Sequence, residues 1–256
     1  MQWAKRGDLL YSKRQAAYNN GMKQTTFAAL TALATAFVVA IILCVHALWL
    51  PQAVFAATDA KMTVVLDAGH GGIDGGVTGK ATGIKESELN LAITLALKEE
   101  LSDMGFEVIL TRKTDAGLYD TTAKGFKKQD MQRRKEIIQA AKPSLVISIH
   151  QNFYPSQSTR GAQVFYEKAN ENGRRFAQCL QTRLNHLYAK QAVKARRIMP
   201  AEYFILHSSS VPTALIECGF LSSALDEALL VSPAFRQNLA KSIAAGVVDF
   251  FADVSA

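Results

Sequence analysis

The chain has 256 residues, of which 49% are hydrophobic and 20% charged, as is typical of a globular protein with a sizeable core. Its net charge of +7 is uneven, because residues 1–50 carry five basic residues and one acidic residue and leave +3 for the remainder. Most of the basicity belongs to the amino terminus, and so small an excess elsewhere gives no charge-based reason to expect a nucleic-acid partner.

The amino-terminal region contains an apolar run, residues 27–50, without one charged side chain. As a helix with ~1.5 Å rise per residue this run would span about 36 Å, more than the ~30 Å hydrocarbon core of a bilayer. The basic residues before it predict a cytoplasmic segment at 1–26, a single transmembrane anchor or uncleaved signal at 27–50, and an extracytoplasmic remainder at the cell membrane. The alternative is a signal peptide cleaved near Ala56, which would give a secreted protein.

Alternating strand and helix patterns follow a short linker at residues 51–60. Short apolar runs predict strands at 61–66, 106–110, 145–149, 162–166, 203–206 and 213–216. Apolar residues at three- and four-residue intervals predict helices from about 86 to 104, and at 129–141, 172–188, 224–231 and 234–251. This order predicts one α/β domain at 61–253, with a twisted, mostly parallel sheet flanked by helices.

Two of the predicted strands lead into histidines. His70 follows the first strand inside a glycine-rich loop, and His150 comes directly after the strand at 145–149. Ligands of open α/β sheets bind outside the carboxyl ends of the strands, so we expect both imidazoles at one rim. Either histidine alone would more often be structural. Together they indicate a zinc site, since catalytic zinc often takes two His and one Glu and keeps a fourth position open.

Four glutamates are candidates for the missing carboxylate. Glu86 and Glu88 begin the predicted helix beside the glycine loop, and the others are Glu202 and Glu217. Glu217 directly follows an apolar strand, so it is expected either to pair with a buried partner or to be functional. Residue types and order leave the choice among the four open.

Four sequence blocks carry a resemblance to a known family. They are VLDAGHGG at 65–72, KESELNL at 85–91, SIHQN at 148–152 and LIECGFL at 215–221. In this order they resemble the signature blocks of the zinc-dependent N-acetylmuramoyl-L-alanine amidases, and the likeness runs from about residue 61 to 251. The resemblance implies one Zn²⁺ ion held by His70, Glu86 and His150, with Glu217 as the catalytic acid and base.

The match to the family motifs also has weak points. Glu86 is chosen over Glu88 because it lies four residues before an Asn-Leu pair, as in the family. The chain has Ala68 where the family commonly has Pro, Phe153 where a small residue is usual, and Ser223 where Asn is usual. None of these departures removes a proposed ligand, so they concern substrate positioning.

The resemblance implies hydrolysis of the amide bond between the lactyl group of N-acetylmuramic acid and L-alanine in peptidoglycan. One catalytic domain behind an amino-terminal anchor is similar to the sporulation-associated amidases, which act on spore cortex. Two alternatives stay open: a zinc peptidase that cuts within the stem peptide, and an inactive, membrane-tethered peptidoglycan-binding module. An activator protein is a possible partner.

Three further expectations concern residues that are not among the proposed ligands or the proposed acid and base. Arg112 could position substrate or pair with Asp115, and Asn152 could donate a hydrogen bond to the substrate. Cys179 and Cys218 have a spacing that fits neither a metal pair nor a disulfide framework, so we expect reduced, partly buried thiols.

Overall fold

The computed structural model describes residues 33, 35–41, 61–120 and 124–254. The expected cytoplasmic segment and linker lie outside these residues, as does most of the expected anchor, of which residues 33 and 35–41 are helical and exposed. Among the described helices, none combines the length and the apolar character needed to cross a membrane. The unit Ala60–Ala256 contains the α/β domain.

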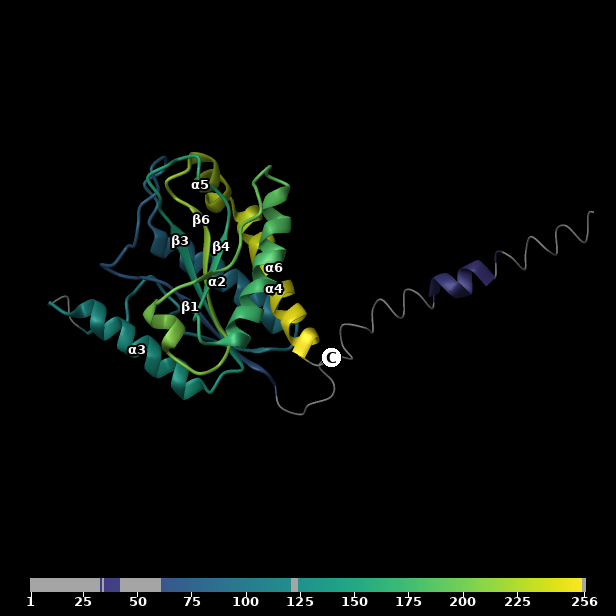
Figure 1. Ribbon diagram of the computed structural model, residues 1–256, viewed down its shortest axis with the longest axis horizontal. Coiled ribbons are helices and arrows are strands. Elements are labelled where there is room, and N and C mark those ends of the chain that lie inside the picture. Colours follow the sequence, from purple (N-terminus) through teal and green to yellow (C-terminus); the bar gives the residue numbers. More distant parts are fainter. Residues whose placement is uncertain (1–32, 34, 42–60, 121–123, 255–256) are drawn as a thin grey trace, which may run out of the picture. The chain divides into compact units, whose positions relative to one another are not determined.

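A six-stranded sheet forms the centre of this unit (Figure 1). Its strands are β1 (Thr63–Ala68), β2 (Glu107–Leu110), β3 (Leu145–Asn152), β4 (Gln163–Tyr166), β5 (Met199–Pro200) and β6 (Thr213–Phe220), in the spatial order β2-β1-β3-β6-β4-β5. Neighbouring strands are parallel except β4 and β6, which are antiparallel. The predicted α/β fold with a mostly parallel sheet is therefore confirmed.

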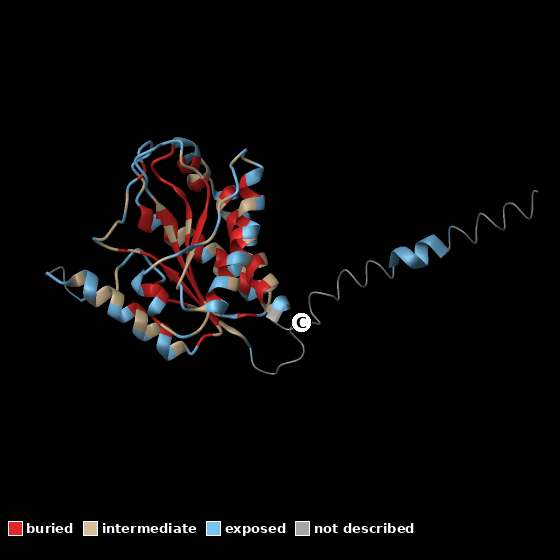
Figure 2. Ribbon diagram, viewed as in Figure 1, coloured by how far each residue is buried: buried red, intermediate tan, exposed pale blue. Residues whose placement is uncertain are grey.

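Helices cover both faces of the sheet (Figure 1). They are α2 (Glu86–Asp103), α3 (Phe126–Ala141), α4 (Glu171–Ala189), α5 (Ala224–Val231) and α6 (Pro233–Val254). Helices α2, α4 and α6 pack together on one face, whereas α3 and the short 3-10 helix η1 (Phe204–His207) lie on the other. The buried residues gather along the strands and the inner sides of these helices (Figure 2). Burial of apolar area on both faces stabilises the sheet.

Two expectations about strands were wrong. The segment predicted as a strand at 203–206 instead forms η1, because its backbone bonds close within the segment, from Leu206 N to the Tyr203 carbonyl oxygen at 3.0 Å, and not to a neighbouring strand. The strands β3 and β6 also continue further than predicted, so His150 and Glu217 lie within them rather than after them. In the parallel register His150 lies opposite Glu217, just before a register shift.

Candidate active site

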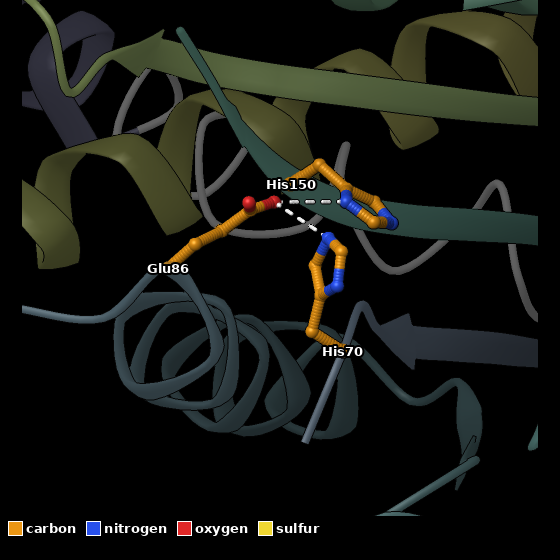
Figure 3. A group of neighbouring side chains, drawn as sticks. All are labelled: His70, Glu86 and His150. Carbon is orange, nitrogen blue, oxygen red and sulfur yellow. Dashed lines mark hydrogen bonds and ion pairs between the residues drawn. The ribbon is translucent and has the colours of Figure 1, made fainter. Parts of the chain in front are cut away.

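His70 lies in the loop after β1, in a conformation that non-glycine residues rarely adopt. Its φ is 60°, in the left-handed region. The backbone is held there because the buried guanidinium of Arg134 donates from Nη2 to the His70 carbonyl oxygen at 2.6 Å and from Nη1 to that of Ala68 at 2.7 Å. This arrangement aims the imidazole at the start of α2 (Figure 3).

Three side chains from distant parts of the sequence meet at this point. His70 comes from the loop after β1, Glu86 from the first residue of α2, and His150 from β3 (Figure 3). Glu86 Oε1 lies 3.3 Å from His70 Nε2 and 3.0 Å from His150 Nδ1. The structure thus brings together the three residues that the sequence resemblance names as ligands.

This donor set fits a zinc ion. One nitrogen or oxygen from each of the three residues lies within 4.8 Å of the others. Ligands ~2.0–2.1 Å from a tetrahedral zinc are about 3.3 Å apart, close to the separations measured from Glu86. His70 Nδ1 also lies 3.1 Å from Asp74 Oδ2, and such a carboxylate fixes the tautomer that leaves Nε2 free for a metal.

The carboxylate of Glu86 is held in place by several donors. The backbone amide of Val77 donates to Oε2 at 2.9 Å, while that of Gln151 and the side-chain amide of Asn90 donate to Oε1 at 3.1 and 3.3 Å. Burial alone would raise the pKa of Glu86, but the hydrogen bonds and charges of the two histidines outweigh it and bring the pKa well below its usual value. Glu86 is therefore a fixed anion beside two imidazoles.

The other candidate glutamates lie elsewhere, with one exception. Glu88 is exposed on α2, and Glu202 is exposed and pairs with His207 Nε2 at 3.2 Å. Glu217 does face the cluster, in the same hollow as the three donors. Its Oε2 atom is buried and has no hydrogen-bond partner among the described residues. Burial raises the pKa of Glu217 to about 7, since it disfavours the charged form.

A buried ion pair beneath the loop was missed by the sequence analysis. Asp67 Oδ1 lies 2.6 Å from Arg134 Nη1, and both side chains are almost fully buried. Thr111 and Ser148 donate to the same carboxylate at 2.7 and 2.6 Å. Arg134 lies in α3 and Asp67 at the end of β1, 67 residues apart, and no local pattern in the sequence indicates that they meet.

Arg112 also supports the loop after β1. Its guanidinium donates to the carbonyl oxygens of Ala68, Gly69 and Ser87 at 2.8, 3.0 and 2.8 Å. The alternative partner, Asp115, is a looser contact at 3.9 Å. Arg112 therefore joins the loop after β1 to the first turn of α2, which carry two of the clustered side chains.

Gly69 is required by the close approach of His150. A Cβ at this position would lie 2.2 Å from the Cε1 and Nε2 atoms of the His150 ring, far inside van der Waals contact.

Asn152 lines one of the hollows at the cluster, and its side-chain oxygen accepts a hydrogen bond from the backbone amide of Phe153 at 2.8 Å. The two described cysteines are free, with Cys218 buried and Cys179 partly buried, as expected.

Two adjoining hollows open at the cluster. One extends between α3 and η1, where its walls include the aromatic rings of Phe126 and Phe204. The other extends past Glu217 toward Asn152 and Phe153. The residues that line both hollows are His70, Asp74, Lys127, His150, Tyr203 and Leu215. An extended substrate could therefore cross the cluster from one hollow into the other.

Comparison with known proteins gives consistent matches. The germination-specific N-acetylmuramoyl-L-alanine amidase of Bacillus subtilis is 33% identical over 193 residues, which cover 74% of this chain and 80% of the relative. AmiA, an N-acetylmuramoyl-L-alanine amidase of Escherichia coli, is 31% identical over 235 residues, covering 75% of this chain and 76% of AmiA. Among solved structures, the CwlD amidase from Clostridioides difficile, in complex with the GerS lipoprotein, has 34% identity and a TM-score of 0.72, covering 75% of this chain and 100% of that one.

The family match extends over most of the α/β domain. Residues 64–249 match the N-acetylmuramoyl-L-alanine amidase family, and this range includes all three clustered side chains and Glu217. Together with the relatives above, it shows that the chain belongs to the N-acetylmuramoyl-L-alanine amidase family.

Proposed function

We propose that this protein is a zinc-dependent amidase that hydrolyses the bond between the lactyl group of N-acetylmuramic acid and L-alanine in peptidoglycan. One observation carries the proposal: the His70–Glu86–His150 cluster lies in one hollow with the enclosed, unpartnered carboxylate oxygen of Glu217. Three metal donors with a separate carboxylate beside them form a set suited to metal-assisted hydrolysis with general acid and base catalysis.

The metal would be held by His70, Glu86 and His150. Bound there, zinc would polarise the lactyl carbonyl and lower the pKa of water toward ~7. Asp74 keeps the His70 imidazole oriented through its Nδ1 proton, and the amides that donate to Glu86 prevent its carboxylate from turning away. These contacts fix the donors before substrate arrives.

Glu217 performs the proton transfers. Its carboxylate accepts a proton from the attacking water and then delivers it to the departing L-alanine nitrogen, which must be protonated to leave. A pKa near neutrality suits both steps, because the group has to accept a proton and release it at the working pH. One carboxylate can therefore serve as base and then as acid.

Replacing Glu217 with Gln tests this assignment. The variant keeps the size of the side chain but cannot carry the proton, so activity should fall by about 10²–10⁴-fold. Its zinc content should stay at that of the wild type, since Glu217 is not among the three donors. Normal turnover by the variant would show that Glu217 does not carry the proton.

Mass spectrometry of digested peptidoglycan distinguishes the amidase from its two rivals. Free lactyl groups and stem peptides that begin with L-alanine would identify an amidase. Shortened stems that stay attached to the sugar would identify a peptidase. Unchanged muropeptides, despite binding to the wall, would identify an inactive peptidoglycan-binding module.

We propose that the protein acts on the peptidoglycan of the spore cortex and is located at the cell membrane. Support comes from the germination-specific amidase of Bacillus subtilis, to which the chain is similar, and from the similar CwlD amidase, whose structure contains the GerS lipoprotein. By analogy with that complex, a lipoprotein is the kind of activator that this chain would use. Residues 27–50 would anchor the domain outside the membrane, and a mature amino terminus at Ala57 would contradict the anchor and favour secretion.

A further inference from the structure

Tyr203 is placed beside the cluster without a function in the mechanism above. It lies just before η1, outside the four motifs, and it lines both hollows together with His70 and His150. One of these hollows also contains Glu217. The residue is 42% exposed and lines both hollows, so a substrate in them would meet it.

The hydroxyl of Tyr203 is the uncommitted polar group of this region. Of the six residues that line both hollows, two are the clustered histidines and Leu215 is apolar. Asp74 is engaged with His70, and Lys127 Nζ lies 3.4 Å from the same Asp74 oxygen. Among the described residues the Tyr203 hydroxyl has no hydrogen-bond partner, which leaves its proton available to a substrate.

The ring of Tyr203 is held by rigid elements. It packs edge-on against Phe165 of β4, with 5.4 Å between ring centroids and an interplanar angle of 78°. Its carbonyl oxygen accepts from Leu206 N at 3.0 Å and so closes the first turn of η1, whose Ile205 and Leu206 are buried in the core. A donor fixed in this way needs little reorganisation when charge develops nearby.

The phenol also keeps its proton at neutral pH. Burial, and after it the negative charge of Glu217, raise the pKa of Tyr203 above its usual value. The group facing the hollow is therefore an O–H donor and not a phenolate.

We propose that Tyr203 is a catalytic residue whose hydroxyl donates a hydrogen bond to the scissile carbonyl oxygen as negative charge develops on it. This role rests on the proposed amidase function. During hydrolysis of an amide, negative charge develops on the carbonyl oxygen. A hydrogen-bond donor that is already in position stabilises this charge. Glu217 moves the proton, and Tyr203 stabilises the charge left on the oxygen.

The test compares Tyr203→Phe with the wild type in the zinc-loaded, full-length protein, using a soluble disaccharide-peptide fragment of peptidoglycan as substrate. Phe keeps the ring and its packing on Phe165 but removes the donor. Loss of one such donor lowers kcat by about 10²-fold or more. We expect that fall in kcat, a KM within about twofold of the wild type, and unchanged zinc content and Tm. Tyr166→Phe, on β4 and outside both hollows, is the matched control and should keep wild-type kinetics.

Each other outcome has a distinct meaning. A Tyr203→Phe protein with wild-type kcat, or one whose loss is confined to KM, would overturn the proposed hydrogen bond and leave the amidase function intact. Loss of zinc or a lowered Tm in this variant would overturn it in favour of a structural role. If the wild type failed to cut the substrate, or if Glu217→Gln kept normal turnover, the proposed function would fail and the Tyr203 role with it.

Discussion

The buried pair of Asp67 and Arg134 makes stability depend on pH in a way that can be measured. The carboxylate of Asp67 is enclosed, and burial alone would raise its pKa. The charge of Arg134 and the hydroxyls of Ser148 and Thr111 outweigh burial and lower the pKa from 3.8 to about 2. Nearly two pKa units at 1.36 kcal/mol each correspond to about 2.5 kcal/mol of stability. Because the folded-state pKa is depressed, this contribution is present above pH ~4 and is lost as the pH falls through ~2.

Asp67→Asn removes this titration while keeping the side-chain shape. The variant should be less stable than the wild type at pH 6, by about 3 kcal/mol or more, since Arg134 loses one of its charge partners. The difference in unfolding free energy between the wild type and Asp67→Asn should become smaller by about 1 kcal/mol between pH 6 and pH 3. Urea unfolding measures this difference, with a chelator present so that metal release does not contribute. The exposed pair of Asp253 with Arg175 gives the control, and Asp253→Asn should change stability by less than ~1 kcal/mol at either pH. A gap for Asp67→Asn that stays constant or widens as the pH falls would refute this account.

The sequence predicts much of this fold because its signals are local. Strand-length apolar runs and the helical spacing of α2, α4 and α6 are properties of neighbouring residues, and these elements lie close to where the patterns indicate. The segment at 203–206 failed for the same reason, since four residues cannot distinguish a strand from a 3-10 turn without the core that buries Ile205 and Leu206.

In the site, too, the residues marked by local sequence patterns were predictable, and those defined by contacts between distant residues were not. The histidines were predictable as candidates because each comes at or near the carboxyl end of an apolar strand pattern, where ligands of parallel sheets bind. The choice of Glu86 over Glu88 required the family motif, and the structure adds that Glu86 points at the imidazoles (Figure 3), whereas Glu88 is exposed. Arg134 and Tyr203 could not be predicted, because their contacts bring together residues far apart in sequence, and nothing near them in the chain marks a polar network or a hollow.

The remaining predictions concern the loop after β1 and the choice of carboxylate. Gly69→Ala should lower zinc affinity, since its Cβ would displace the His150 ring, whereas Gly75→Ala in the same loop meets only the flexible side chain of Lys85 and should bind zinc normally. Titration with zinc against a competing chelator measures both, and equal affinities would contradict the predicted clash. Glu86→Gln and Glu88→Gln form a second matched pair, because both residues lie in the first turn of α2 but only Glu86 is buried against the histidines. Changing an outer partner of a ligand typically costs ~10–100-fold in metal affinity, so loss of the ligand itself should cost more than about 10²-fold. Glu86→Gln should therefore lose zinc and activity together while Glu88→Gln keeps both, and the reverse result would show that the metal takes its carboxylate from the exposed side of the helix.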